Sequence, residues 1–241
     1  MTFSEIKHEL EGLAPADGLR WVSDRFGKDA KFSTSFGIED QLIAYWIGTQ
    51  KLDLEVFSID TGRMFQETYD VMALTTAKYK LPLRVYFPES SQVEELVARK
   101  GPNSFYESVD NRKECCHIRK VEPLKRALQG AQVWITGLRA SQSGNRQSME
   151  LVSWDEGYQV VKYNPILHWS VEEVEAVIEE KKIPVNTLHR KGYPSIGCAP
   201  CTRAIAPGED IRAGRWWWES SAKECGLHSV EENQEKKNVV G

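Results

Sequence analysis

The sequence predicts an α/β fold: an open, twisted parallel sheet with helices on both faces. Short apolar, β-branched runs alternate along the chain with segments whose apolar residues recur every three to four positions. Parallel strands need a crossover helix between them, and the crossover helices cover both faces of the sheet. The 241 residues are 41% hydrophobic and 27% charged, a composition that is typical of folded globular chains and excludes a mostly disordered one.

Strands are predicted from short runs of apolar and β-branched residues. The first, Lys31–Ser35, leads through a Phe-Gly turn into a helical segment, and the second, Leu54–Asp60, is also followed by a turn and a helical segment. The others are Leu83–Phe87, Val133–Thr136 and Val160–Tyr163. Open α/β sheets bind ligands at the carboxyl ends of their strands, so functional residues are expected in the loops Ser33–Gly37, Asp60–Arg63 and Thr136–Arg146.

Helices are predicted where apolar residues repeat at helical spacing. The segment Ser4–Phe26 forms two amphipathic helices that break near Pro15. The segment Ile38–Ile47 carries Glu39 and Asp40 in its first turn, where acidic side chains complement the helix dipole. Further helices are expected at Phe65–Lys80, about Cys116–Leu128, and Val171–Lys182.

No repeat or linker divides the chain, so the sequence predicts a single domain over residues 1–241, with residues 1–28 as N-terminal helices. After Lys182 the periodicity gives way to a segment rich in Gly, Pro, Cys, Arg and Trp, which we expect to be a functional C-terminal extension. Its last part, about residues 205–241, is expected to be an arm followed by a mobile tail with a charged, solvated end.

Charge and hydropathy argue against two classes of partner. The net charge of −4 and the pI near 5.8 leave no general basic surface for nucleic acid. No stretch approaches the ~18 uninterrupted apolar residues of a membrane span. Charged residues occupy Met1–Leu13, where a signal peptide would be apolar. We therefore expect a cytoplasmic protein that binds neither nucleic acid nor membranes.

Four of the five cysteines form two pairs, Cys115-Cys116 and Cys198-Ala199-Pro200-Cys201. A disulfide between adjacent cysteines would be strained, because neighbouring Cα atoms lie about 3.8 Å apart and disulfides prefer roughly 4.4–6.8 Å. Two pairs of thiols favour one tetrahedral site instead. The spacing is compatible with a structural zinc ion, an iron–sulfur cluster or redox-active dithiols. The adjacent pair is unlike common zinc-ribbon halves and slightly favours the cluster.

The fifth cysteine, Cys225, stands alone near the C-terminus. An isolated cysteine is by default a free surface thiol. Lys223 and His228 are near enough in sequence to favour its thiolate form, however, and Gly226 adjoins it. Cys225 is therefore a candidate nucleophile, and His228 is a candidate for a supporting catalytic role.

The segment Ser33–Asp40 combines hydroxyl groups and successive amides at the start of a helix, an arrangement that binds phosphate or sulfate. No G-K-[ST] sequence follows, so it is not a Walker A loop, and Ser and Gly before a helix also act as ordinary caps. Cationic residues in loops that the topology brings together strengthen the interpretation and indicate a multiply anionic small ligand. These residues are Arg119, Lys120, Arg146, Arg212 and Arg215.

Three long motifs occur in order along the chain. They begin C-C-H-I-R-K at Cys115–Leu124, G-C-A-P-C-T-R at Gly197–Trp216, and E-C-G-L-H at Glu224–His228. The motifs resemble those of the thioredoxin-dependent assimilatory sulfonucleotide reductases, the APS/PAPS reductase family, and within it the adenylyl-sulfate (APS) reductases. Asp60–Arg63 and Ser33–Asp40 match the same family, so the resemblance spans about residues 30–228.

The resemblance implies a fold of the adenine-nucleotide α-hydrolase type, related to the ATP pyrophosphatases. Those proteins carry S-G-G-x-D-S where this chain has S-F-G-I-E-D at Ser35–Asp40, a departure that fits a protein holding a phosphate–sulfate anhydride without cleaving ATP. A [4Fe-4S] cluster is implied on Cys115, Cys116, Cys198 and Cys201, with Lys120 between cluster and substrate. The substrate-binding residues expected are Ser33, Ser35, Gly37, Thr61, Gly62, Arg63, Arg146, Arg212 and Arg215.

The implied activity is reduction of APS to sulfite and AMP by reduced thioredoxin, in assimilatory sulfate reduction and cysteine biosynthesis. Cys225 would attack the sulfur of APS and carry an S-sulfocysteine (thiosulfonate) intermediate, with Lys120 stabilising the departing phosphate. Thioredoxin would then release sulfite. Reduction of PAPS, or of both nucleotides, stays open, as do a zinc-stabilised nucleotide-binding module and a redox sensor. We also expect a homo-oligomer, either a dimer or a tetramer.

Overall fold

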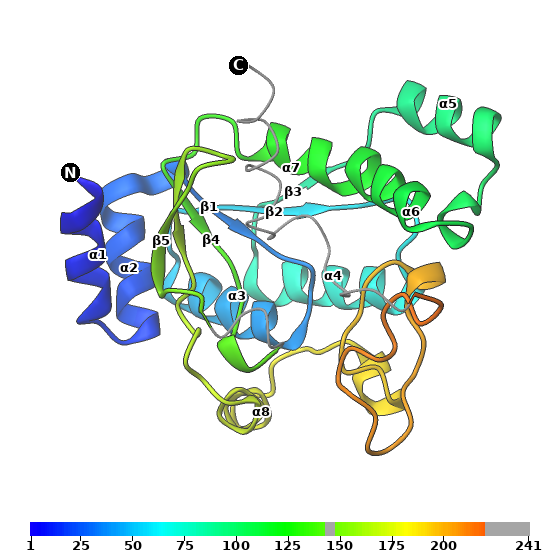
Figure 1. The fold of residues 1–241 in the computed structure, drawn as a ribbon. Coiled ribbons are helices and arrows are strands. Elements are labelled where there is room, and N and C mark those ends of the chain that lie inside the picture. Colours follow the sequence, from blue (N-terminus) through cyan, green and yellow to red (C-terminus); the bar gives the residue numbers. More distant parts are fainter. Residues whose placement is uncertain (143–147, 220–241) are drawn as a thin grey trace.

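The computed structural model describes residues 1–142 and 148–219, and its centre is a six-stranded sheet (Figure 1). The strand order is β3-β2-β1-β4-β6-β5. The strands are β1 (Ala30–Ser33), β2 (Glu55–Ile59), β3 (Leu83–Tyr86), β4 (Val133–Ile135), β5 (Val152–Asp155) and β6 (Val160–Tyr163). All strands but β5 pair in parallel and coincide with the predicted segments. The α/β fold class is confirmed.

The edge strand β5 was not predicted and runs antiparallel to β6. Val152 pairs with Tyr163 and Asp155 pairs with Val160. Its sequence, V-S-W-D, only alternates between apolar and polar residues, and Trp154 is exposed. Only Val152 of this edge strand is buried, so β5 lacks the continuous apolar run that identifies strands buried on both faces.

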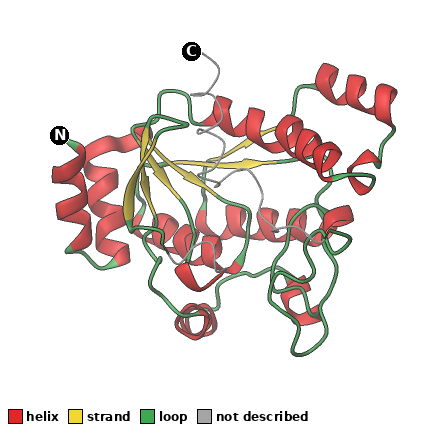
Figure 2. Ribbon diagram, in the orientation of Figure 1, coloured by secondary structure: helices red, strands yellow, loops and turns green. Residues whose placement is uncertain are grey.

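Helices cover both faces of the sheet, as the sequence predicted (Figures 1 and 2). They are α1 (Phe3–Glu11), α2 (Pro15–Phe26), α3 (Ile38–Gln50), α4 (Gln66–Tyr79), α5 (Ser90–Lys100), α6 (Val109–Cys116), α7 (Glu122–Ala127) and α8 (Val171–Glu180). On one face α2, α4 and α8 pack against α3, while α7 contacts β2 and β3 on the other. The sequence did not predict α5 and α6, because each buries only one side chain, Leu96 and Arg112.

Two hydrophobic cores lie on opposite faces of the sheet. Neighbouring residues of one strand enter different cores: Val56 packs into the larger core and Phe57 into the smaller one. This burial on both faces explains the continuous apolar runs of the parallel strands. Leu10 and Leu19 are fully buried in the larger core, and each contributes about 1.5–3 kcal/mol by leaving water. The N-terminal helices are therefore integral to the folded body.

The chain from residue 183 to residue 219 is rich in loops, with short turns at Thr187–Lys191 and Ala199–Cys201 (Figure 2). A bridge between Thr202 and Arg215 folds this segment back on itself. Figure 1 shows the segment, in yellow to orange, below the end of α6. Across residues 1–142 and 148–219, no helix has the length and apolar character needed to cross a membrane.

Candidate functional site

A cavity of about 290 Å³ lies at the carboxyl ends of β1, β2 and β4. The parallel register sets Ser33 beside Phe57 and Phe32 beside Ile135, so the loops that follow these strands meet there. The position is the one that open α/β sheets use for ligands, and the volume is near the lower end of small-molecule sites. The predicted residues that line it are Ser33, Ser35, Gly37, Thr61, Lys120, Arg212 and Arg215.

The loop after β1 is held by the side chain of Asp40. Its Oδ2 accepts hydrogen bonds from the N–H of Ser35 at 2.6 Å and from the hydroxyl of Ser35 at 2.8 Å. Phe36 is buried and has a φ of +61°, in the left-handed region that strains residues other than glycine. Its N–H donates to the hydroxyl of Thr34 at 3.0 Å. The loop is therefore fixed by its own side chains at the start of α3.

Two acidic residues, Glu39 and Asp40, line the cavity beside this loop. Burial raises the pKa of Asp40 to about 6, and the hydrogen bonds from Ser35 partly oppose that rise. Glu39 is paired with the buried Arg139, whose Nε and Nη2 both lie 2.9 Å from Glu39 Oε1. Arg139 therefore offsets one of the two negative charges that an anionic ligand would meet.

The two cysteine pairs come together around a second, smaller cavity. Cys115 and Cys116 lie at the end of α6, and Cys198 and Cys201 lie at the turn Ala199–Cys201. Lys120 and Cys198 line both cavities, so the two are adjacent. The other residues around the cysteine cavity are Arg63, Phe105, Arg112, Arg119, Pro200, and Trp216.

Hydrogen bonds tie the C-x-x-C turn to the loop after β2. The N–H of Ala199 donates to the carbonyl of Arg63 at 2.8 Å, and Oγ1 of Thr61 lies 3.2 Å from Sγ of Cys198. Within the turn, the N–H of Cys201 donates to the carbonyl of Cys198 at 2.9 Å. The end of a core strand therefore positions one pair of thiols.

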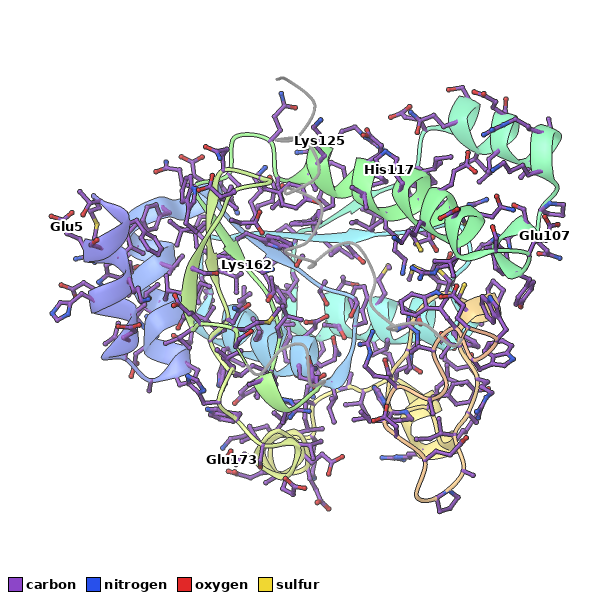
Figure 3. All side chains as sticks on the ribbon, in the orientation of Figure 1. Glu5, Glu107, His117, Lys125, Lys162 and Glu173 are labelled. Carbon is purple, nitrogen blue, oxygen red and sulfur yellow. The ribbon has the colours of Figure 1, made fainter. Side chains whose placement is uncertain are left out.

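A π-helical turn, His117–Val121, follows Cys116 and positions two cationic residues. Such turns are rare in proteins, and those that occur are often found at functional sites. Arg119 is buried and donates from Nη1 to the carbonyl of Thr61 at 2.7 Å, while Lys120 lines both cavities. His117 lies on the solvent side of this helix, with 60% of its side chain exposed (Figure 3). The turn therefore contributes its cations, and not its histidine, to the site.

Arg215 is fixed between a tryptophan ring and a glycine. Its guanidinium carbon lies 4.7 Å from the ring centre of Trp216, and a Cβ at position 197 would clash with the guanidinium group. Gly197 therefore makes room for Arg215. The N–H of Trp216 donates to the carbonyl of Cys201 at 3.2 Å. Arg215 lines the large cavity, and its neighbour Trp216 lines the cysteine cavity.

Burial raises the pKa of the Cys115 thiol and raises that of Cys201 to about 12. The neighbouring Cys198 adds to the rise at Cys201, whereas Lys120 and Arg215 oppose it. Thiols with such pKa values are neutral and weakly nucleophilic unless a positive centre binds them. Among the residues that the structure describes, no three His, Cys, Asp or Glu side chains converge on a point that could hold a single metal ion.

Two predicted substrate-binding residues, Gly62 and Arg63, are not among the residues that line the large cavity. Arg63 lines the cysteine cavity, donates to the carbonyl of Pro102, and lies 5.1 Å above the ring of Phe105. Gly62 has a φ of +70° in a turn closed by its N–H, which donates to Oδ1 of Asp60 at 2.7 Å. The turn needs glycine for its conformation, because side chains rarely adopt this φ.

Three predicted residues, Arg146, Cys225 and His228, lie outside the described residues. Asp40 and His189, which line the large cavity, and Arg139, which pairs with Glu39 there, were not predicted as site residues. The sequence placed Asp40 in the first helical turn and at the end of the anion-binding segment Ser33–Asp40, but it gave the Asp40 side chain no role in holding Ser35. Arg139 stands in the same loop as Arg146, and no sequence signal identified His189, which lines the large cavity.

Known proteins resemble this chain over most of its length. Residues 30–204 match the phosphoadenosine phosphosulfate reductase domain family. The chain is 49% identical over 220 residues to an adenosine 5'-phosphosulfate reductase of Agrobacterium fabrum. The matched region covers 91% of this chain and 84% of the relative. The motif resemblance found in the sequence is therefore confirmed.

Solved structures extend the comparison to the fold. The phosphate complex of phosphoadenylyl-sulfate (PAPS) reductase from Candida auris matches with a TM-score of 0.71 and 29% identity, over 84% of this chain and 96% of that one. FMN adenylyltransferase of Candida glabrata, bound to FMN and an ATP analogue, matches with a TM-score of 0.53 at 13% identity, over 89% and 73%. The second likeness concerns the fold alone, which is adenine-nucleotide α-hydrolase-like. With most of its length matched, this chain belongs to the phosphoadenosine phosphosulfate reductase domain family.

Proposed function

We propose that this protein reduces adenosine 5'-phosphosulfate (APS) to sulfite and AMP, with reduced thioredoxin as electron donor, in assimilatory sulfate reduction and cysteine biosynthesis. One observation carries the proposal: Lys120 lines both the large cavity at the strand ends and the four-cysteine cavity, so the two cavities are adjacent. The name of the Agrobacterium fabrum relative, at 49% identity, supports APS as the substrate.

The phosphosulfate group is expected beside the loop after β1. Ser35 and Gly37 immediately precede α3, and the N-terminus of a helix favours an anion through its amides and its dipole. Lys120, Arg212 and Arg215 line the same cavity and supply positive charge. Arginine binds sulfate and phosphate oxygens in a two-pronged geometry, so these side chains would orient the anhydride as well as attract it.

The cysteine cavity fits a [4Fe-4S] cluster. Four thiols are the ligand set that such clusters use, and cluster sulfurs accept hydrogen bonds. Within residues 1–142 and 148–219, Nε of Arg119 and Nε1 of Trp216 are buried without a hydrogen-bond acceptor, and both residues line this cavity. The ligands would be Cys115, Cys116, Cys198 and Cys201. When bound, the cluster supplies an electrostatic and positioning influence beside Lys120.

In the first proposed step, the thiolate of Cys225 attacks the sulfur of APS. A sulfur–sulfur bond forms, the bond between that sulfur and the bridging oxygen breaks, and AMP leaves with the electron pair. Lys120 and Arg215 stabilise the negative charge that grows on the leaving phosphate. Cys225 then carries S-sulfocysteine. His228, three residues further along, is proposed to favour the thiolate form of Cys225.

In the second proposed step, one thiol of reduced thioredoxin attacks the sulfur of Cys225 and sulfite leaves. The mixed disulfide is then resolved by the second thiol of thioredoxin, which restores the Cys225 thiol and leaves oxidised thioredoxin. The two electrons that reduce the sulfur of APS to sulfite therefore come from the thioredoxin dithiol.

The test is sulfite release by anaerobically purified protein with reduced thioredoxin, offered APS and PAPS in parallel while the visible spectrum is recorded. We expect a brown protein that turns over APS, and a Cys225→Ser variant that stays brown and releases no sulfite. Equal use of PAPS would widen the substrate to both nucleotides. A colourless, zinc-loaded protein that releases no sulfite would favour the nucleotide-binding module, and sulfite release by Cys225→Ser would overturn the mechanism.

A further inference from the structure

A buried ion pair joins α6 to Glu219, the last residue that the structure describes. Nε of Arg112 donates to Oε1 of Glu219, and Nη2 donates to Oε2, each at 2.9 Å. The two residues are 107 positions apart in sequence, and each side chain is only 4% exposed. The structure therefore clamps this point of the C-terminal segment to the helix that ends in Cys115 and Cys116.

The surroundings of the pair connect it to both cavities. The guanidinium carbon of Arg112 lies 4.8 Å from the ring centre of Trp216, and that of Arg215 lies 4.7 Å from the same ring. Arg112 lines the cysteine cavity and Arg215 lines the large cavity. The N–H of Glu219 donates to the carbonyl of Trp216 at 2.9 Å. The segment from Trp216 to Glu219 is therefore fixed beside the cysteine cavity, and it directly follows Arg215, which lines the large cavity.

A buried ion pair is a poor means of gaining stability. The free energy that two charges lose on leaving water is about as large as the attraction they gain, so apolar residues of similar size often stabilise as well. What the pair supplies is geometry, because a two-pronged arginine–carboxylate contact accepts few orientations. Arg112 and Glu219 are thus better suited to holding the backbone in one place than to strengthening the fold.

We infer that Arg112 and Glu219 are positioning residues for Cys225, an inference that rests on the proposed function. Cys225 follows Glu219 by six residues, and six residues span at most about 20 Å. Because Glu219 is anchored to Arg112, which lines the cysteine cavity, the inferred effect is to keep the Cys225 thiol within this reach of the cavity. Such confinement raises the effective concentration of the nucleophile, which accelerates the first step without adding a contact to the substrate.

The test compares Glu219→Gln with Glu209→Gln. Glu209 makes a similar two-pronged contact with Arg203, at 3.0 Å for both bonds, but these side chains are 38% and 35% exposed and the pair lines neither cavity. Each iron-loaded protein is mixed with APS without reductant, and S-sulfocysteine at Cys225 is followed by mass spectrometry. AMP affinity, iron content and melting temperature are measured in parallel. A further variant inserts two glycines after Glu219, which leaves the ion pair intact.

For Glu219→Gln we expect adduct formation to slow by about 10-fold or more, with kcat falling and KM, AMP affinity and iron content close to wild type. The glycine insertion should slow the adduct similarly, and Glu209→Gln should stay within about 2-fold of wild type. The inference would be overturned if Glu219→Gln and the insertion variant both formed the adduct at the wild-type rate. It would also be overturned if Glu219→Gln formed the adduct slowly only because it had lost iron, while the insertion variant kept the wild-type rate. A wild-type protein that forms no adduct would instead overturn the proposed function.

Discussion

The hydroxyl oxygen of Thr61 lies 3.2 Å from the sulfur of Cys198, so the loop after β2 touches the C-x-x-C turn directly. The same hydroxyl accepts a hydrogen bond from the N–H of Arg63 at 3.2 Å, and the carbonyl of Thr61 accepts one from Arg119. One buried threonine therefore connects a core strand, the C-x-x-C turn and the π-helical turn. A substitution of Thr61 should therefore alter the positions of residues that line the cysteine cavity.

We expect Thr61→Val to lower the free energy of unfolding by about 1 kcal/mol, the usual net value of a hydrogen bond, and to reduce the rate of sulfite release. Thermal unfolding under anaerobic conditions measures the first effect. The matched control is Thr49→Val, which removes an exposed hydroxyl that bonds to the carbonyl of Tyr45 at 2.7 Å. Equal losses of stability in the two variants would contradict a special role for the Thr61 hydroxyl.

The raised pKa of Asp40 predicts a pH-dependent stability. Because its folded-state pKa is about 6 and its unfolded value is about 4, the stabilising contribution is complete below pH 4 and is lost as pH rises through about 6. The difference corresponds to about 3 kcal/mol. We expect the free energy of unfolding of wild type, minus that of Asp40→Asn, to decrease between pH 4.5 and 7.5. Urea unfolding at several pH values measures this, and a constant difference would show that Asp40 titrates normally.

Replacing Lys120, which lines both cavities, tests its contribution to catalysis. Lys120→Ala should lower kcat for sulfite release by about 10²–10³-fold, because it removes a cation from the growing charge on the leaving phosphate. The melting temperature should change little. Lys125→Ala is the control, since Lys125 is exposed on α7, five residues further along the chain (Figure 3). A Lys120→Ala variant as fast as Lys125→Ala would remove Lys120 from the site.

The cysteines should divide into two functional classes. Cys201→Ser should lose most of its iron, acid-labile sulfide and visible absorption, because Cys201 lines the cysteine cavity and thiolates hold such clusters. Cys225→Ser should keep all three and lose only sulfite release. Iron analysis and the visible spectrum of each purified variant decide between these outcomes. Full iron content in Cys201→Ser would contradict its assignment as a ligand.

Gly137 permits a close approach between the loop after β4 and the start of α3. A Cβ at position 137 would lie 3.2 Å from the backbone nitrogen of Asp40 and from Cβ of Glu39, and closer still to Oδ1 of Asp40. Gly137→Ala should therefore destabilise the fold by about 1–3 kcal/mol and weaken AMP binding. At Gly12 the nearest atom would be 3.7 Å away, so Gly12→Ala should leave AMP binding unchanged. Calorimetric titration with AMP compares the two variants.

Much of the fold could be predicted because local patterns are strong where burial is complete. The parallel strands bury continuous apolar runs, and the helices packed on them bury periodic apolar residues. Both kinds of element can therefore be recognised from the sequence. Segments with little burial could not: β5 buries only Val152, α5 buries only Leu96, and the buried side chain of α6 is Arg112. The single-domain organisation and the homo-oligomer stay predictions.

The site shows the same division. The sequence by itself determined the chemical inventory, which comprises the two cysteine pairs, the cationic loop residues and the anion-binding turn, because residue types and short spacings are local properties. Only the tertiary structure decided which of these meet. In the structure the two cysteine pairs surround one cavity, and Arg63 lines that cavity and not the large one. Arg139 pairs with Glu39, and Arg112 pairs with Glu219. Such pairings depend on how distant segments cross the sheet, a long-range relationship that periodicity does not encode.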